Sequence, residues 1–153
     1  MFDIYLELHR LYGEKLGFVT KPRLNVDEFD YLPRPLPDSF MTLNSDTDRE
    51  RHFFLEYFDE GVSIGIHGRR IAQHMTYKHD GNWTATNLPF PAIVIVCQSP
   101  LLLKQAEKRI RYLERQYDSE IQFQLVDLAT LHAAESADDQ IWIDPIEKTK
   151  TVL

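Results

Sequence analysis

The first apolar residues of the chain recur at helical spacing. Ile4, Leu8 and Leu11 fall on one side of a helical wheel, and Gly17 is placed to end the element. The pattern predicts an amphipathic opening helix within residues 1–17.

The next segments differ in composition. Residues 18–37 hold four prolines and several acidic residues, which predicts an irregular or extended connection. Ser39–Asn44 and His52–Phe58 are rich in aromatic and apolar residues and are separated by the polar residues 45–50, so they are expected to pair as an antiparallel hairpin. After a short acidic turn, apolar residues at helical spacing predict a helix over residues 64–79.

The second half of the chain contains three elements and a short tail. Residues 91–97 are continuously apolar and rich in β-branched side chains, which is typical of a central strand covered on both faces. Ser99 and the following proline open a helix over residues 100–117. Residues 121–127 alternate and predict a strand with one buried face, and residues 141–145 predict a short edge strand closed by a proline.

The order of these elements is helix, strand, strand, helix, strand, helix, strand, which indicates an α/β fold with a mixed sheet. The length of 153 residues fits one domain. We expect its core over residues 38–128, followed by an acidic C-terminal segment at residues 129–153.

Composition narrows the class of protein. A hydrophobic share of 43% is enough to fill a core, and the single cysteine excludes a disulfide framework. The longest apolar run, residues 89–97, is far shorter than the roughly 20 residues that a membrane-spanning helix needs. Acidic and basic residues interrupt the N-terminus where a leader would be apolar. We therefore expect a soluble, cytoplasmic protein without a membrane partner.

Charge is unevenly distributed. The net charge is −7, yet residues 99–117 carry five basic and two acidic residues, a net of +3. A protein that coats a duplex is normally basic, since phosphate contacts by Lys and Arg supply most of the non-specific affinity. The chain alone is therefore expected to bind nucleic acid weakly.

Two carboxylates stand where adjacent strands could bring them together. Asp38 follows a proline at the start of the first hairpin strand, and Glu56 is the lone acid in an apolar run of the second. Carboxylates that converge in this way can bind a hard divalent cation, which activates water for attack on a phosphodiester. The element order αβββαβ, with Pro-Asp on one strand and Glu-x-Lys on the next, is the pattern of the PD-(D/E)xK nucleases.

The stretch LPDSFMTL, then FFLEYFDEG, GRRIAQHMTY and LPFPAIVIV, resembles the nuclease-like domain of the replication-relaxation proteins of plasmids and other mobile elements. The resemblance covers roughly residues 1–117. It implies a restriction-endonuclease-like core and a role in DNA metabolism. It also implies an upstream winged-helix DNA-binding domain, which this chain does not contain, or a DNA-bound protein partner in its place.

The resemblance assigns roles by position. Asp38 and Glu56 become the acidic pair, Asp59 a further metal ligand, and Arg70 the basic residue of the helix, with Mg²⁺ as the cofactor of an active site. Phe58 departs from the pattern, because a nuclease keeps Lys two residues after the Glu. An aromatic side chain neither orients water nor stabilises developing negative charge, so an active enzyme would need Arg70 or Lys78 as a substitute.

Structural interpretations stand beside these roles. Asp38 fits a turn or cap, and Glu56 fits an ion pair with Arg51, Arg69 or Arg70. His67 and His74 share a helix face and are expected to be solvated. The lone cysteine, Cys97, is expected to be an inert buried thiol.

A stripe of cations along residues 100–117 is typical of a solvated helix face, but its spacing also suits phosphates. The candidates for nucleic-acid contacts are Arg69, Arg70, Lys104, Lys108, Arg111 and Arg115.

Three hypotheses of function remain open. The domain could be a degenerate nuclease fold that positions DNA or binds a protein through its acidic C-terminal segment, which the phenylalanine at the lysine position favours. It could be an active Mg²⁺-dependent DNA nuclease. It could also be a stand-alone protein-interaction regulator without a nucleic-acid role.

Overall fold

The computed structural model describes residues 1–24, 31–44 and 50–153. Within them the helices are α1 (Phe2–Tyr12), η1 (Gly13–Lys15), α2 (Lys21–Leu24), α3 (Ile64–His79), η3 (Asn82–Thr86), α4 (Pro100–Tyr117) and α5 (Leu128–Ala133). The strands are β1 (Leu16–Thr20), β2 (Ser39–Asn44), β3 (Glu50–Phe58), β4 (Ala92–Cys97), β5 (Phe123–Asp127), β6 (Trp142–Asp144) and β7 (Thr149–Thr151).

The described strands form one mixed, seven-stranded sheet whose spatial order is the same as the sequence order, from β1 to β7. The strands β1, β2 and β3 are antiparallel neighbours, whereas β3, β4 and β5 run parallel. The strands β6 and β7 return antiparallel at the far edge. The predicted α/β class, mixed sheet and hairpin pairing are therefore confirmed.

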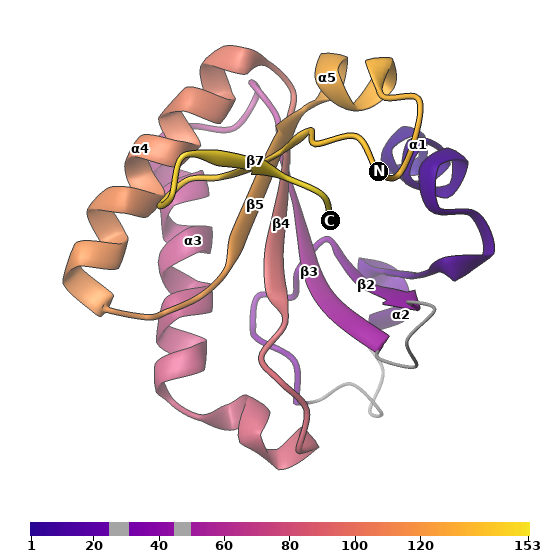
Figure 1. Cartoon of the computed structure of the whole chain (residues 1–153). Coiled ribbons are helices and arrows are strands. Elements are labelled where there is room, and N and C mark those ends of the chain that lie inside the picture. Colours follow the sequence, from indigo (N-terminus) through magenta and orange to yellow (C-terminus); the bar gives the residue numbers. More distant parts are fainter. Residues whose placement is uncertain (25–30, 45–49) are drawn as a thin grey trace.

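Helices cover both faces of this sheet (Figure 1). Helices α3 and α4 pack on one face through an apolar cluster that includes Ile71, Met75 and Ile110. Helices α1 and α5 cover the other face through a second cluster that includes Leu8 and Leu131. Because successive side chains of a strand point to opposite faces, each residue of β3 faces either the α3 and α4 layer or the α1 and α5 layer.

The helix α4 begins as the sequence indicates. The Ser99 side chain accepts a hydrogen bond from the Leu102 N–H, and Pro100 takes the first helical position, where no backbone donor is needed. The six residues of β4 are all buried, which confirms the predicted central strand with both faces covered.

The structure differs from the N-terminal predictions in two places. The opening helix ends at Tyr12 rather than near residue 17, because Gly13 adopts a φ of 56° and breaks the helical path. Residues 16–20 then form strand β1, and α2 follows, so the segment 18–37 is not irregular throughout. The acidic residues at 27–30 and most of the turn at 45–50 lie outside the described residues.

Two C-terminal predictions also need correction. The strand β5 is buried on both faces, because the helices α4 and α5 lie on opposite sides of it. The strand β6 is not an edge, since β7 pairs with it. The acidic segment 129–153 contains most of α5 and both final strands, and Trp142 is fully buried.

No helix in the described part of the chain has both the length and the apolar character needed to cross a membrane.

Candidate functional site

The alternation of β3 places Glu56 against helix α3. Phe54, Glu56 and Phe58 point to the same face of the strand, and both phenylalanines belong to the cluster that packs on α3 and α4. The Glu56 side chain is consequently buried, with the residue 2% exposed. An isolated carboxylate would be costly at this depth, so α3 has to supply charge and hydrogen bonds.

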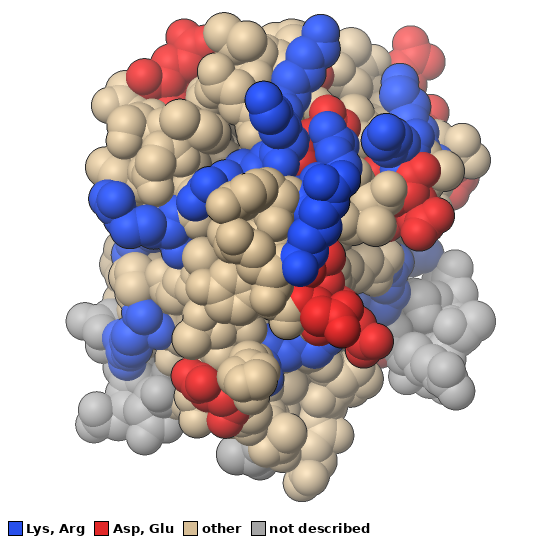
Figure 2. All heavy atoms as spheres, turned by 90° about the vertical axis from the view of Figure 1, so that its left-hand side faces the viewer, with Lys and Arg blue, Asp and Glu red and all other residues tan. Residues whose placement is uncertain are grey.

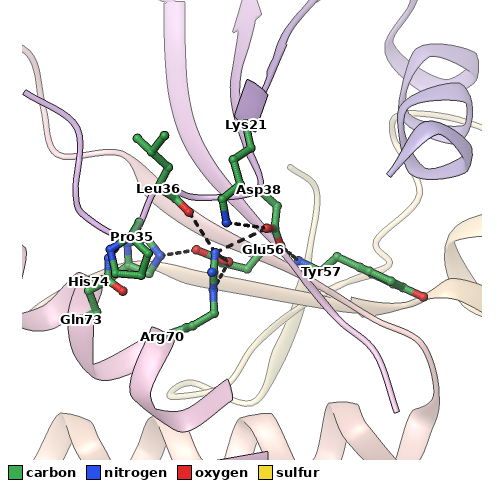
Figure 3. A network of polar contacts seen from close by, with 9 residues as sticks. All are labelled: Lys21, Pro35, Leu36, Asp38, Glu56, Tyr57, Arg70, Gln73 and His74. Atoms are coloured by element: carbon green, nitrogen blue, oxygen red, sulfur yellow. Dashed lines mark hydrogen bonds and ion pairs between the residues drawn. The ribbon is translucent and has the colours of Figure 1, made fainter. Parts of the chain in front are cut away.

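Arg70 and His74 supply them from consecutive turns of α3 (Figure 3). Arg70 donates to Glu56 Oε2 through Nε, at 2.7 Å, and through Nη2. His74 lies 2.7 Å from Glu56 Oε1 and donates through Nε2. Residues four apart share one helix face, so both side chains reach the same carboxylate. Each oxygen of Glu56 is thus bonded to a nitrogen of α3.

Asp38 joins this group from the start of β2. Its Oδ2 accepts the Tyr57 N–H at 3.0 Å, which fixes the carboxyl group beside β3. Its Oδ1 lies 3.5 Å from Arg70 Nη2 and 3.8 Å from Lys21 Nζ. Burial, and next the charge of Glu56, raise the pKa of Asp38 above its ordinary value.

The guanidinium of Arg70 therefore lies between the two predicted acidic residues. It also donates to the Leu36 carbonyl at 3.2 Å, so its orientation is set by three elements of the chain. The structural ion pair expected for Glu56 forms with Arg70 rather than with Arg51 or Arg69. With Lys21 beside Asp38, two cations balance two carboxylates without any added ion.

A pocket of about 370 Å³ opens next to this ion pair. Its walls include Asp38, Asp59 and Arg70, so three of the predicted site residues do lie around one space. Asp59 does not join the ion pair: its Oδ1 accepts the Gly61 N–H at 2.8 Å and stabilises the turn before α3.

Phe58 occupies the core where a nuclease would keep its lysine. It is fully buried, and its ring stacks on His67 with the centroids 4.1 Å apart. His67 in turn donates through Nε2 to the Asp59 carbonyl at 3.0 Å. The prediction that His67 and His74 are solvated is wrong, because both residues are buried between α3 and the sheet.

Lys78 is not brought to the site, which contradicts its predicted role. It lies two helical turns beyond Arg70, donates to the Glu120 carbonyl at 2.9 Å and rests over the Phe90 ring. A side chain held at the far end of α3 does not reach the carboxylates of Asp38 and Glu56. Arg70 is the cation that α3 delivers to the carboxylates.

The arrangement does not fit a Mg²⁺ site. Mg²⁺ requires oxygen ligands in near-octahedral geometry, but both Glu56 oxygens are bonded to nitrogens and a guanidinium fills the space between the acids. Across the described residues, no three His, Cys, Asp or Glu side chains gather closely enough to hold a metal ion.

No family model, curated protein or solved structure matches this chain.

The predicted nucleic-acid contacts fall into three groups. Arg69, Lys104, Lys108 and Arg115 are exposed on α3 and α4. Figure 2 views the molecule from this side, where basic side chains gather with acidic ones among them. Arg111 is half-buried and donates to the Pro145 carbonyl at 3.1 Å, and Arg70 belongs to the ion pair. Neither is therefore as free to contact a nucleic acid as the four exposed cations.

Sequence reasoning missed three participants. His74 and Lys21 contact the two carboxylates, and Arg109, on α4, packs against Gly68 of α3. His74 carried a usable signal, since it follows Arg70 by four residues on the helix. Cys97 is buried as expected, and burial raises the pKa of its thiol to about 12.

Proposed function

We propose that this chain is a non-catalytic, restriction-endonuclease-like domain that positions DNA in the replication or relaxation of a plasmid or other mobile element. The observation that carries the proposal is the Arg70 guanidinium, which lies between Asp38 and Glu56, where a nuclease of this type would hold its metal ion.

The order of elements supports this assignment. Helix α1 is followed by β1, β2 and β3, then by α3 and β4, which is the αβββαβ order typical of the PD-(D/E)xK nucleases. The Pro37-Asp38 pair enters β2 and Glu56 lies on the adjacent strand β3. Both acidic positions of the motif are therefore occupied and close to each other.

A guanidinium can replace the charge of a metal ion but not its chemistry. It neutralises the carboxylates and holds the strands and α3 together. It remains protonated at any physiological pH, and it does not lower the pKa of a bound water as a divalent cation does. With Phe58 in place of lysine, the site also lacks the group that would stabilise a phosphorane, so the domain is expected to leave phosphodiesters intact.

An active Mg²⁺-dependent nuclease is the second candidate, and one observation favours it. Asp38 and Asp59 line a common pocket into which water or a phosphate could enter. The reaction would require Arg70 to leave Glu56, which would expose a buried carboxylate to a new cation.

Isothermal titration calorimetry with Mg²⁺ and with Mn²⁺ tests the proposal, using the native chain, Glu56→Gln and Asp38→Asn. We expect no saturable heat from any of the three, and no cleavage of single-stranded or double-stranded DNA. Native binding that both variants abolish, together with cleavage lost in Asp38→Asn, would contradict the proposal and establish the nuclease.

A further inference from the structure

Five cations on α3 and α4 have neither a carboxylate nor a hydrogen-bond acceptor as a partner among the described residues. The side chains of Arg69, Lys104, Lys108, Arg109 and Arg115 make no hydrogen bond or ion pair with any residue that the structure describes. The chain has 24 acidic residues and only 17 Lys and Arg, so carboxylates are in excess. Cations that stay unpaired in an acidic protein leave their charge available to an external anion.

Arg109 is held in an unusual position among these five. Its Nε would lie only 2.7 Å from a Cβ placed at Gly68, so the side chain fits against α3 only because that residue is glycine. The Nε–H is buried and has no acceptor among the described residues. A donor this deep is out of reach of a group outside the chain, so the terminal nitrogens of the guanidinium are the ones that can meet an external anion.

Tyr112 is fixed beside Arg109 although it is 51% exposed. The Arg109 guanidinium lies over its ring at 5.3 Å, and the Gln116 amide donates to its hydroxyl at 3.0 Å. Arg109 precedes Tyr112 by three positions and Gln116 follows it by four, so residues of α4 itself hold the ring. An exposed aromatic ring with a fixed orientation can accept a flat partner at little entropic cost.

The ring and the cations line one groove between α3 and α4. The groove has a volume of about 350 Å³, and its walls are Ile64, Gln105, Lys108, Arg109 and Tyr112. The walls thus combine apolar surface with two unpaired positive charges.

We propose that this groove binds single-stranded nucleic acid, with a base on Tyr112 and phosphates on Lys108 and Arg109. The inference rests on the proposed function and names the form of nucleic acid that the domain holds. Sites for single strands combine aromatic rings, on which bases stack, with cations that follow the backbone. A paired base in a duplex offers no free face to Tyr112, and an acidic peptide would use the cations without the ring.

Fluorescence anisotropy with a labelled oligo(dT) in EDTA measures this binding. We expect Tyr112→Ala to weaken the affinity roughly 5- to 150-fold, the loss that removal of one stacking side chain produces. Tyr117→Ala is the matched control, because Tyr117 is 40% exposed at the end of the same helix and outside the groove. The Tyr117→Ala variant should bind oligo(dT) with the affinity of the native chain.

A salt titration tests the phosphate contacts. Arg109→Gln should reduce the slope of log K against log[salt] by about 0.7, the value for one phosphate contact on a single strand. Lys150→Gln removes the same charge from the exposed strand β7 and should leave the slope unchanged. Circular dichroism of each variant confirms that the fold is intact.

Three results would overturn the inference. The first is an absence of oligo(dT) binding. The second is a loss in Tyr117→Ala as large as in Tyr112→Ala. The third is binding of duplex DNA or polyglutamate with equal affinity and no effect of Tyr112→Ala, which would reveal a surface for any polyanion. Since EDTA removes metal ions, none of these results depends on the calorimetric test of the proposed function.

Discussion

Arg70 and Arg109 lie on neighbouring helices and have different surroundings. The Arg70 guanidinium is bonded to Glu56 and to the Leu36 carbonyl and lies close to Asp38. Within the described part of the chain, the one charged or aromatic partner of the Arg109 guanidinium is the ring of Tyr112. The charge of Arg70 is therefore used within the fold, whereas the charge of Arg109 is left available to an external anion.

The difference follows from what each arginine faces. Glu56 is buried on the sheet, so its charge has to be compensated within the protein. Arg109 lines the groove between α3 and α4, where none of the described lining residues is a carboxylate. Loss of Arg70 should consequently affect stability, whereas loss of Arg109 should affect binding.

The largest effect is expected for Arg70→Met. The substitution leaves Glu56 buried without its cation, and the loss of one partner of a buried pair typically costs about 3–5 kcal/mol. Arg109→Met should change stability by less than about 1 kcal/mol, as at most surface positions. Urea unfolding monitored by circular dichroism checks both, and equal losses would remove the distinction between the two arginines.

A double substitution separates charge from packing at the first site. Arg70→Met combined with Glu56→Gln removes both charges, while the amide oxygen can still accept from His74. We expect the double variant to recover about 1–3 kcal/mol relative to Arg70→Met alone, since no unpaired charge remains. Additive losses in the urea midpoints would mean that Arg70 acts through packing.

Gly68→Ala should change binding in the groove that Arg109 lines and leave the ion pair of Arg70 and Glu56 intact. A Cβ there would displace the Arg109 side chain, whereas alanine favours the helix by up to about 1 kcal/mol. We expect unchanged or slightly higher stability together with weaker oligo(dT) binding. The control is Gly65→Ala, one turn earlier, where the new Cβ would lie 3.9 Å from Ser63 Oγ. Equal binding by the two variants would contradict the role of Arg109.

The smallest effect concerns pH and Asp38. The pKa of Asp38 is raised in the folded state, so above pH 3.8 the folded protein binds more protons than the unfolded chain. The carboxyl group of Asp38 therefore lowers the stability of the fold as the pH rises through its folded pKa. Asp38→Asn should therefore be at least as stable as the native chain at pH 7. The difference should vanish below pH 3.8, and thermal melts across this range measure it.

The sequence predicts those features that depend on strong local patterns. The hairpin of β2 and β3, the apolar strand β4 and the capped helix α4 follow from alternation, burial and end signals. The approach of Asp38, Glu56 and Arg70 follows from the order of strands together with the family resemblance. These three residues meet as the pattern implies, although in the arrangement of a structural ion pair.

Short elements and contacts between helices could not be predicted in this way. The strands β1 and β7 have five and three residues, too few for a clear period, and the edge position predicted for β6 is wrong because the pattern does not reveal its neighbour β7. Charge spacing along α4 grouped Arg111 with the exposed cations, although Arg111 is bonded to the Pro145 carbonyl. It overlooked Arg109, because the glycine that makes room for this side chain lies on α3.

The strand order of the sheet has a consequence for how the chain assembles. From β2 to β7, each strand pairs with the strand that precedes it in the sequence. No strand therefore has to insert between two strands that come earlier in the chain. Sequential pairing avoids the still longer closures that an interleaved strand order would require. The sheet can therefore grow strand by strand in the order in which a ribosome releases the chain.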